Sequence, residues 1–325
     1  MGVLPFVFMA NQTEIEDHYD TLGTLHALRL KDVHDGFPDY TCAFFDGDFS
    51  KTLQQAQKDK HAWIFEGLGL GQDLSGKRIL DIGCGWGPIL EAVRKRGGEA
   101  VGLTLSPGQV AYCSSRGLDA RLTDYKKISE HPLGKFDAVI SIGAFEHFCS
   151  VEEFIAGKQD TIYREFFEIC SSLLGPGDGV YLQTMTWGKK TPDPRSLSLD
   201  APKHSEEAIL ARLTKFYPGS WLPTGLEQIK KAAEPNFSFI KSNNGRSDYI
   251  ETLKRWSAAT KNLFRPSILP SALKAGIPLL FRSIFDRDTR LRFMALRNGD
   301  QRECFKREIM SHERMFFRKI LKTIW

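Results

Sequence analysis

Hydrophobic and polar positions along the middle of the chain follow two alternating periods. Short apolar runs occupy residues 78–82, 100–103, 136–141 and 179–185, and the stretches between them place apolar residues at helical spacing. Apolar runs that alternate with amphipathic helices are typical of a parallel β-sheet covered on both faces. The pattern therefore predicts an α/β core in which these four runs are strands.

Turn and capping residues predict the helices of this core. A glycine-rich turn follows the first run, and a helix from about Pro88 to Arg96 comes after it. Ser106 stands where an N-cap residue belongs, before a helix that extends toward Ser115. A further helix, ending near Leu174, leads toward the fourth run.

The length of 325 residues allows one large α/β domain with insertions or two small domains. We expect four parts along the chain. These are an N-terminal helical lid segment over residues 1–70, a nucleotide-binding core over 71–187, a substrate lid insertion over 188–235, and the C-terminal part of the sheet over 236–325. The last part carries a basic and apolar insertion.

The hydrophobic content of 42% and charged content of 26% are ordinary for a soluble globular protein. No run approaches eighteen uninterrupted apolar residues, which argues against a transmembrane helix. The apolar start, residues 1–10, lacks the basic flank of a signal peptide. We interpret it as a packing arm, with membrane contact as the alternative.

The six cysteines are scattered and include no Cys-x-x-Cys pair. This pattern indicates a reducing compartment, and it argues against a disulfide framework and against a metal site. We therefore expect a cytoplasmic protein that could also lie peripherally at a membrane.

The net charge of +4 hides an asymmetry. Residues 251–325 hold 17 Lys and Arg against 7 Asp and Glu, a net charge of +10, so the rest of the chain carries −6. A basic C-terminal part suits an anionic partner such as phospholipid head groups, an acyl carrier protein or nucleic acid. A solvated basic face is the plainer interpretation.

The segment from Phe264 to Phe285 is apolar, is broken by Pro266, Pro270 and Pro278, and is followed by an arginine cluster. Such a segment could dock on an anionic bilayer or frame the mouth of an acyl tunnel. An internal cap on the domain is the alternative. The prolines and charges exclude a membrane-spanning segment.

The glycine-rich turn reads Asp-Ile-Gly-Cys-Gly-Trp-Gly over residues 81–87. Glycines between a strand and a helix let the backbone approach a bound nucleotide, and the helix N-terminus favours a ligand carboxylate. The acid at the strand end can pair with a ligand ammonium group, and no downstream Lys-Ser/Thr makes a phosphate loop. A simple tight turn is the alternative. The expected cofactor contacts here are Asp81, Gly83, Cys84, Gly85 and Gly87.

Two later positions extend this nucleotide site. The second strand of such folds normally ends in an acid that holds the ribose hydroxyls, but here Thr104 stands there, followed by Leu105 and then Gln109. Asp124 and Tyr125 follow the third strand, where an acid and a ring could meet an adenine. A surface turn is the alternative for this pair.

Ordered motifs along the chain resemble the cyclopropane fatty acid synthases, a family that includes the mycolic acid cyclopropane synthases and related methyltransferases. The motifs lie at residues 18–20, 40–45, 52–60, 83–87, 102–109, 141–148, 217–223 and 249–256. The segment Ser-Ile-Gly-Ala-Phe-Glu-His-Phe at 141–148 is the strongest match. The resemblance implies S-adenosylmethionine (SAM) as cofactor and a Rossmann-like class I methyltransferase fold with a mainly parallel seven-stranded sheet. It also adds Tyr40 and Thr41 to the cofactor contacts.

In that family the double bond of a lipid acyl chain attacks the SAM methyl group, and a bound bicarbonate removes a proton so that the ring closes. The resemblance implies a bicarbonate cradle made of Cys42, Ile142, Glu146 and Tyr249. Glu146 and Tyr249 would hydrogen-bond the anion, whereas the other two would chiefly contribute backbone groups. The alternatives are a structural carboxylate for Glu146 and a small buried hydrophobe for Cys42.

Aromatic residues of the same motifs would line an apolar pocket that excludes water, or would simply pack in the core. They are Tyr40, Phe44, Phe45, Phe145 and Phe148.

Gln183 departs from the family pattern, because the family usually places a histidine there that touches the bicarbonate. Glutamine donates hydrogen bonds but cannot carry a proton. Methyl or methylene branching, or transfer to another nucleophile, is then an alternative to ring closure. His147, next to Glu146, could serve as the base.

The leading hypothesis is a SAM-dependent C-methyltransferase that acts on the double bond of an unsaturated acyl chain, with bicarbonate or a side chain as general base. The alternative is a methyltransferase for a small amine or natural product on the same scaffold. A non-catalytic SAM- or lipid-binding protein is disfavoured because Cys42, Glu146 and Tyr249 are all present. Nucleic-acid methylation is disfavoured because the Asn/Asp-Pro-Pro-Tyr motif is absent.

Overall fold

The computed structural model describes residues 39–130, 132–217, 219–286, 290 and 299–321. The expected packing arm at residues 1–10, the motif at 18–20 and most of the expected N-terminal lid segment lie outside the described residues.

The described residues form one seven-stranded sheet with the strand order β3-β2-β1-β4-β5-β7-β6. Strands β1 to β5 pair in parallel, and β7 runs antiparallel to both of its neighbours, β5 and β6. The strands are β1 (Arg78–Ile82), β2 (Glu99–Thr104), β3 (Asp119–Leu122), β4 (Phe136–Ile142), β5 (Leu174–Trp187), β6 (Phe237–Asn244) and β7 (Met310–Lys319). The expected mainly parallel seven-stranded sheet is confirmed.

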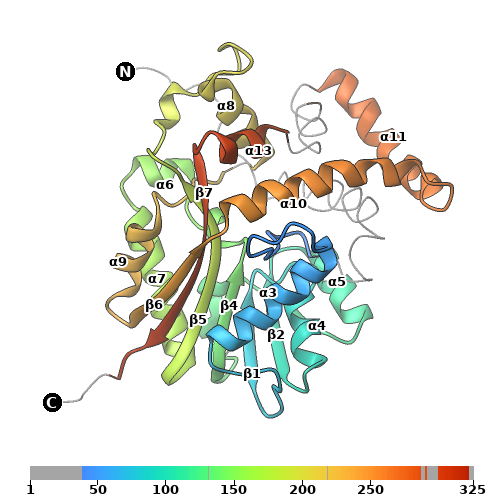
Figure 1. Ribbon diagram of the computed structural model, residues 1–325. Coiled ribbons are helices and arrows are strands. Elements are labelled where there is room, and N and C mark those ends of the chain that lie inside the picture. The colour runs from blue at the N-terminus through green and yellow to red at the C-terminus, as the bar shows by residue number, and fades with distance from the viewer. Residues whose placement is uncertain (1–38, 131, 218, 287–289, 291–298, 322–325) are drawn as a thin grey trace.

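The helices cover the sheet on both faces (Figure 1). The α-helices are α3 (Leu53–Gly67), α4 (Pro88–Arg94), α5 (Pro107–Ser115), α6 (Val151–Ile155), α7 (Gln159–Leu173), α8 (Glu206–Phe216), α9 (Leu226–Ala233), α10 (Arg246–Ala259), α11 (Leu269–Phe285) and α13 (Gly299–Lys306). Short 3-10 helices are η2 (Tyr125–Glu130), η3 (Phe145–His147), η4 (Pro194–Ser196) and η5 (Thr260–Phe264).

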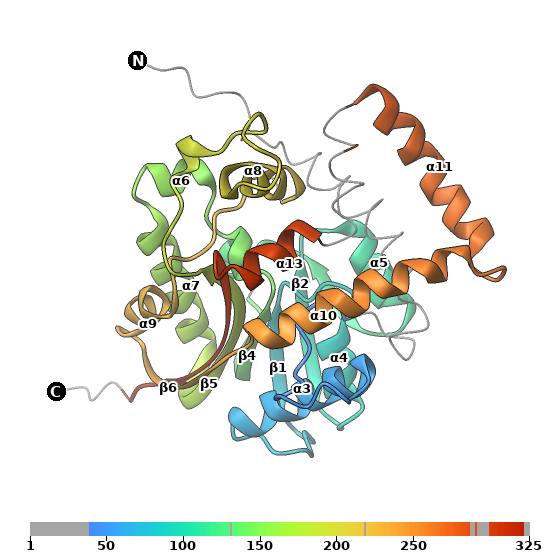
Figure 2. The ribbon, with the colours of Figure 1, turned by 45° about the horizontal axis from the view of Figure 1, so that its top comes forward.

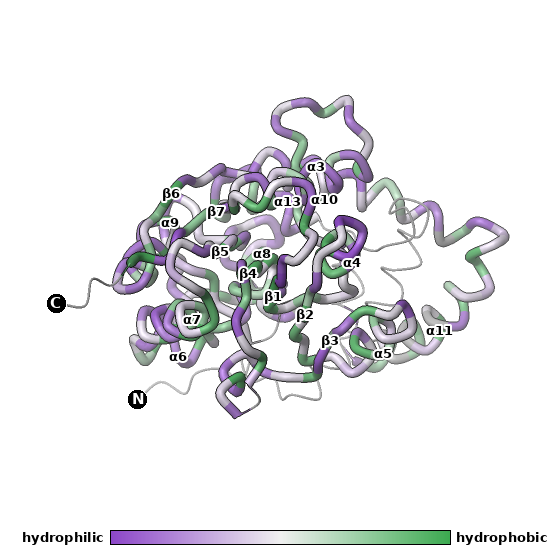
Figure 3. The backbone as a smooth tube through the Cα atoms, turned by 90° about the horizontal axis from the view of Figure 1, so that it is seen from below, coloured by the Kyte–Doolittle hydropathy of each residue, from purple (hydrophilic) through white to green (hydrophobic). Residues whose placement is uncertain are grey.

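Two apolar clusters hold these layers together. On one face, Ile64 and Phe65 of α3 and Ile89 of α4 pack against the strands. On the other face, side chains of α7 and α9 pack against Leu182 and Phe317. Seen from below, hydrophobic and hydrophilic residues alternate along the helices and strands (Figure 3).

A third apolar cluster lies over the carboxyl ends of the strands. It joins the segment after Asp39, helices α8, α10 and α13, and the ends of β5 and β7. The 45° view shows α10 and α13 crossing this edge of the sheet (Figure 2). Ligands of open α/β sheets bind at the carboxyl ends of the strands, so this cluster covers the place where a site is expected.

The predicted strand, helix and helix cap around the glycine-rich turn are present. Strand β1 and helix α5 have the expected positions, and the Ser106 side chain accepts a hydrogen bond from the Gln109 N–H at 3.2 Å as an N-cap.

The six cysteines are buried free thiols. Within the described residues, no helix is long and apolar enough to cross a membrane, and no group of His, Cys, Asp or Glu side chains could hold a metal ion.

The apolar segment near residue 270 differs from the expectation of a chain broken by prolines. Residues 269–285 form the single helix α11, and Pro278 lies inside it. Pro270 falls in the first helical turn, where the missing N–H is not needed. The helix continues through Pro278, although that proline removes one backbone hydrogen bond.

Candidate active site

The turn after β1 is held open by glycines in left-handed conformations. Gly83, Gly85 and Gly87 have φ values of +83°, +53° and +78°. A Cβ on Gly83 would lie 2.3 Å from the Cβ of Ala144, whereas a Cβ on Gly85 would meet no atom within 4 Å. The first glycine is therefore required by packing, and the second leaves open space beside the backbone, as a closely bound ligand needs.

Asp81 ends its strand beside this turn. Its side chain is buried, with 2% of its surface exposed. Burial and the nearby Asp39 carboxylate raise the pKa of Asp81 to about 8. A buried carboxylate is costly unless a cation or donor joins it, and the ammonium group of an amino-acid ligand supplies both.

A second set of polar residues lies at the carboxyl end of β2, at the same edge of the sheet as Asp81. Thr104 Oγ1 donates to Gln109 Oε1, and the Ser106 N–H donates to Thr104 Oγ1 at 3.2 Å. Leu105 lies between them with 62% of its surface exposed. Cys84 lies beneath this strand, since a Cβ on Gly102 would approach its sulfur to 2.6 Å.

Asp124 and Tyr125, which follow β3, have different surroundings. Asp124 Oδ1 accepts the Lys126 N–H at 3.0 Å, which shapes the turn after β3. Tyr125 is a core residue, with its ring 4.4 Å from the Phe148 ring and 5.7 Å from the Phe166 ring. The structure therefore leaves Asp124 at the strand edge and packs the Tyr125 ring against α7.

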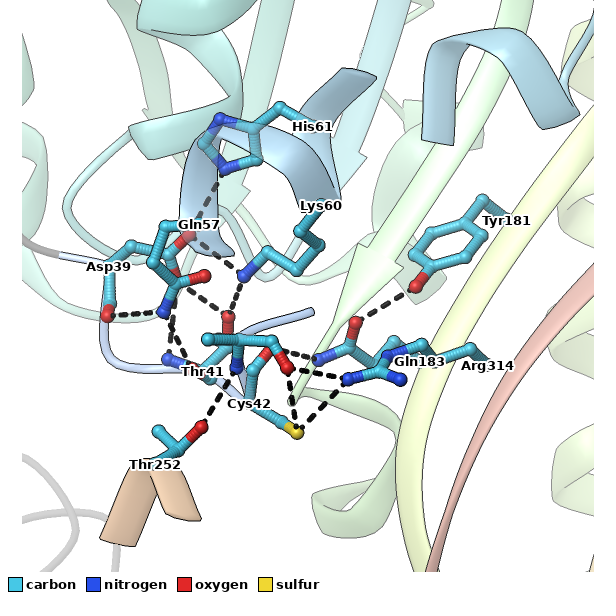
Figure 4. A network of polar contacts seen from close by, with 11 residues as sticks. Asp39, Thr41, Cys42, Gln57, Lys60, His61, Tyr181, Gln183, Thr252 and Arg314 are labelled. Carbon is cyan, nitrogen blue, oxygen red and sulfur yellow. Dashed lines mark hydrogen bonds and ion pairs between the residues drawn. The ribbon is translucent and has the colours of Figure 1, made fainter. Parts of the chain in front are cut away.

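A buried polar network ties the segment after Asp39 to helix α3 (Figure 4). Lys60 Nζ lies 2.8 Å from Asp39 Oδ2 and also donates to Thr41 Oγ1, while His61 Nε2 lies 3.0 Å from the same carboxylate oxygen. Burial would raise the pKa of Asp39, but Lys60 and His61 outweigh it and hold that pKa far below its usual range. The Gln57 amide donates to the Thr41 carbonyl at 2.9 Å. These contacts fix Thr41 at the strand edge.

Cys42 follows directly and is held from three sides (Figure 4). Its carbonyl accepts the Gln183 Nε2 at 3.2 Å, and its sulfur lies 3.3 Å from Arg314 Nη2. The same Nη2 donates to the Ala43 carbonyl at 2.6 Å, and Arg314 Nη1 lies 2.9 Å from Asp248 Oδ2. Burial raises the pKa of Cys42 to about 12, so the thiol stays neutral.

Both ends of the Gln183 side-chain amide are engaged in hydrogen bonds within the protein. Its Oε1 accepts the Tyr181 hydroxyl at 2.8 Å, and its Nε2 donates to Cys42. It pairs in register with Ile142 on one side and Arg314 on the other, so it lies in the middle of the buried sheet. Its observed role is to hold the backbone of Cys42.

Glu146 lies just past the end of β4 in helix η3. Its Oε2 accepts the Thr184 hydroxyl at 2.8 Å. Burial raises the pKa of Glu146 to about 7, although hydrogen bonds from its own backbone, Thr184 and the Met185 N–H act against that rise. His147 Nδ1 lies 2.7 Å from Ser220 Oγ, and burial lowers the pKa of His147 to about 4.

These two side chains border a small cavity of about 40 Å³. The rest of its wall is mostly apolar and comes from β5, α8, the segment after α8, and β7. The apolar and aromatic lining residues are Met185, Trp187, Leu210, Leu213, Tyr217, Leu222 and Met310. Gln301 of α13 also lines it, and its amide lies 3.2 Å from Met185 Sδ.

Tyr249 joins the same region from α10. Burial raises its pKa well above the usual value, and the nearby groups Tyr217, Cys42 and Glu146 raise it further. The ring lies 4.9 Å from Phe305 and 5.0 Å from His312. The structure therefore brings together Cys42, Glu146 and Tyr249, which are more than 200 positions apart at the extremes.

The aromatic residues of the motifs pack in the core rather than around this cavity. Phe145 stacks on Tyr163 at 4.3 Å, and Phe44 stacks on Trp63 at 4.8 Å. Phe45 is fully buried. The core-packing alternative therefore holds for these three rings.

The sequence analysis did not predict four residues that line the cavity or contact Cys42 and Glu146. They are Thr184, Trp187, Gln301 and Arg314. The last two come from the C-terminal part of the chain, and no spacing in the sequence places them beside residues 42 and 146. One signal was available for α3, because Gln57 and Lys60 lie on its apolar, buried face. Polar residues on such a face indicate a buried network.

Comparison with known proteins identifies the family. The sequence profile of the mycolic acid cyclopropane synthetase family matches residues 9–265. The chain belongs to this family. Among its members, cyclopropane mycolic acid synthase 2 of Mycobacterium leprae is 31% identical over 260 residues, which cover 75% of this chain and 78% of the relative. Methoxy mycolic acid synthase MmaA3 of Mycobacterium tuberculosis is 29% identical over 260 residues, covering 77% and 80%.

Solved structures of the family agree. Mycolic acid cyclopropane synthase CmaA1, complexed with S-adenosylhomocysteine (SAH) and CTAB, has a TM-score of 0.69 at 25% identity, covering 98% of this chain and 99% of that one. The cyclopropane synthase MmaA2 from Mycobacterium tuberculosis has the same fold, with a TM-score of 0.68 at 23% identity, covering 98% and 100%. The chain is thus an enzyme of the SAM-dependent methyltransferase class, and SAM is its cofactor.

Proposed function

We propose that this enzyme transfers the SAM methyl group to a carbon–carbon double bond of an unsaturated acyl chain. The observation that carries the proposal is the position of Glu146, a buried carboxyl in the wall of a mostly apolar cavity at the carboxyl ends of β4 and β5. An apolar wall suits a hydrocarbon acceptor and excludes the water that would quench a carbocation. The family membership and the acyl substrates in the names of its members support the same acceptor class.

The residues of the glycine turn fit SAM. Asp81 offers a buried carboxylate to the ammonium group, and Gly85 leaves the space that close backbone approach needs. Thr104 and Gln109 would hold the ribose in place of the usual acid, and Asp124 would lie near the adenine. When bound, SAM supplies an electrophilic methyl group, whose bond to sulfur breaks as the alkene electron pair forms the new carbon–carbon bond.

After methyl transfer, the protein must remove a C–H proton from the acyl chain. Glu146, with a pKa of about 7, is partly ionised at neutral pH and can accept a C–H proton as the carboxylate. In its neutral form it can instead share the cavity with a bicarbonate ion, because a proton then lies between the two groups. The electron pair of the broken C–H bond closes a ring or forms a branched alkene. Either way the acyl chain gains one CH₂ unit.

The lid over the acceptor is proposed to include residues 188–235. Leu210, Leu213, Tyr217 and Leu222 of that range line the cavity, so the range supplies much of the apolar wall. The acceptor would be presented at a lipid surface, and peripheral contact with an anionic membrane is part of the proposal.

A small-molecule acceptor is the second candidate. The cavity of about 40 Å³ holds only a few atoms, and His147, neutral at physiological pH, could accept a proton from an amine. An amine acceptor predicts activity that is indifferent to vesicles.

The deciding experiment is mass spectrometry of products after incubation with methyl-labelled SAM and unsaturated phospholipid, with and without bicarbonate. A labelled gain of one CH₂ unit on the acyl chain supports the proposal, and stimulation by bicarbonate assigns the proton acceptor. Saturated phospholipid is the matched control. SAM binding without any acyl product would refute the acyl acceptor and direct the assay to amines.

A further inference from the structure

Helix α11 presents an unusual surface. Six large apolar side chains of this 17-residue helix are about half or more exposed, and they are Leu273 (48%), Ile277 (56%), Leu280 (54%), Phe281 (66%), Ile284 (60%) and Phe285 (80%). Single exposed apolar residues are ordinary, but a contiguous set marks a binding surface. We call these six side chains the α11 apolar face.

The spacing makes this face a continuous stripe. Residues 273, 277, 280 and 284 recur every three or four positions and so share one side of the helix. Ala272 and Ser283, on a different side, are buried. Among the side chains of α11 that the structure describes, the buried ones are small and the six large apolar ones named above face outward, the reverse of a helix that caps a core.

The place of α11 in the fold separates it from the cavity. Both ribbon views show α11 at the side of the molecule, away from the sheet, beyond the far end of α10 (Figures 1 and 2). Along the chain, α10 leads through η5 into α11, and Tyr249 and Trp256 of α10 pack over the strand ends. Hydrophobic and hydrophilic stretches alternate along α11 (Figure 3). The family profile ends at residue 265, so α11 lies outside the matched region.

Charge identifies the kind of partner. Residues 252–285 include six Lys and Arg and no Asp or Glu. Lys261, Arg265 and Lys274 of this stretch are exposed. A second copy of the chain would bring an equally positive surface against this one, which Coulomb repulsion opposes. An anionic lipid bilayer supplies both an apolar interior for the stripe and negative head groups for the basic residues.

We propose that the α11 apolar face docks the enzyme on an anionic membrane, with its large side chains at the level of the acyl chains. This inference rests on the proposed function, because it names the surface from which the acyl substrate is taken. No helix of the described residues is long and apolar enough to span a bilayer, so α11 lies in the interface.

The test is co-sedimentation of the full-length protein with vesicles of phosphatidylcholine containing 30% phosphatidylglycerol, beside vesicles of phosphatidylcholine alone. We expect binding to the anionic vesicles that weakens in high salt, and a loss of about tenfold or more in the Ile277→Ser/Phe281→Ser variant. Both replaced residues are largely exposed, so the fold does not depend on them. The matched control is Leu122→Ser/Ile240→Ser, which replaces two exposed apolar residues of strands β3 and β6 outside the α11 apolar face and should bind like the wild type.

Three results would overturn docking: no binding to anionic vesicles, equal binding by the α11 variant, or a wild-type dimer in sedimentation velocity that this variant dissociates. Methyl transfer to detergent-dispersed unsaturated phospholipid, measured in parallel, tests the proposed function by itself. If docking is right, the α11 variant keeps that activity and loses activity on vesicles. If neither protein methylates dispersed lipid, the acyl acceptor fails while the sedimentation result still decides docking.

Discussion

The amide of Gln183 donates to the backbone carbonyl of Cys42 across 3.2 Å, joining the middle of β5 to the segment that precedes α3. The other end of the same amide accepts the Tyr181 hydroxyl at 2.8 Å. Through these two contacts the Gln183 side chain links Cys42 to Tyr181 in the interior.

Replacing Gln183 by Leu should lower the free energy of unfolding by about 1–3 kcal/mol for each group left unpaired, since the Cys42 carbonyl and the Tyr181 hydroxyl both lie in the interior. Urea denaturation measures this change. Gln72→Leu, at an exposed position, is the control and should change stability little. Equal stability of the two variants would mean that Gln183 does not hold Cys42 in solution.

Replacing Glu146 by Gln should reduce methyl transfer by about 100-fold or more, because a general base contributes that much and the amide cannot accept the proton. Wild-type activity should rise with pH through about 7, the pKa of this carboxyl. Initial rates with labelled SAM measure both effects. Glu165→Gln, at an exposed position, should behave as the wild type, and an active Glu146→Gln enzyme would exclude this carboxyl as proton acceptor.

The same substitution has an effect on stability with a defined sign. Because the pKa of Glu146 is higher in the folded state than its usual value of 4.5, the folded state holds the proton more tightly. Wild-type stability should therefore fall as pH rises from about 4.5 to about 7. Glutamine has no proton to lose, so the Glu146→Gln variant avoids this cost. The free energy of unfolding of the variant minus that of the wild type should therefore be about 1–3 kcal/mol larger at pH 8 than at pH 4. A constant difference would contradict the raised pKa.

Three glycine-to-alanine variants distinguish the effects of backbone strain, of a clash with a neighbouring side chain, and of lost space for the ligand. Gly71, Gly83 and Gly85 all have positive φ, but only at Gly83 does the new Cβ meet an atom of the protein within 4 Å. All three should lose about 1 kcal/mol of stability from backbone strain. Gly83→Ala should lose substantially more, and Gly85→Ala should fold like Gly71→Ala yet lose SAM binding in calorimetry. Normal SAM affinity of Gly85→Ala would place the cofactor elsewhere.

Replacing Lys60 by Met leaves the Asp39 carboxylate buried with His61 alone. Breaking a buried pair costs about 3–5 kcal/mol, so the variant should unfold at much lower urea concentration and should lose SAM affinity as Thr41 moves. Lys51→Met removes a surface pair with Asp59 and should cost at most about 1 kcal/mol.

Adding Asp39→Asn to the Lys60→Met variant should recover part of the lost free energy of unfolding, because the buried charge is then removed.

The same pair should make wild-type stability depend on pH. Since the pKa of Asp39 is depressed in the folded protein, the stability that the pair provides should decline progressively as pH falls below about 4. Comparable losses for Lys51→Met and Lys60→Met would contradict a buried pair.

The sequence by itself determined the local elements and the glycine-rich turn. Strand, glycine turn and helix at residues 78–94, and the Ser106 cap, depend on side-chain period and on backbone freedom, which are properties of neighbouring residues. The motifs also named Cys42, Glu146 and Tyr249 before any of them could be placed in space.

Only the tertiary structure decided what surrounds those residues. Arg314 reaches Cys42 across 272 positions because β7 inserts between β5 and β6, and Gln301 reaches Met185 because α13 crosses the strand ends. The pKa of Glu146 depends on burial, which no local pattern specifies. The outward apolar face of α11 was likewise undecided, because the same composition also fits an internal cap. Long-range packing sets which side of a helix meets the protein, and that choice is made only when the whole chain has folded.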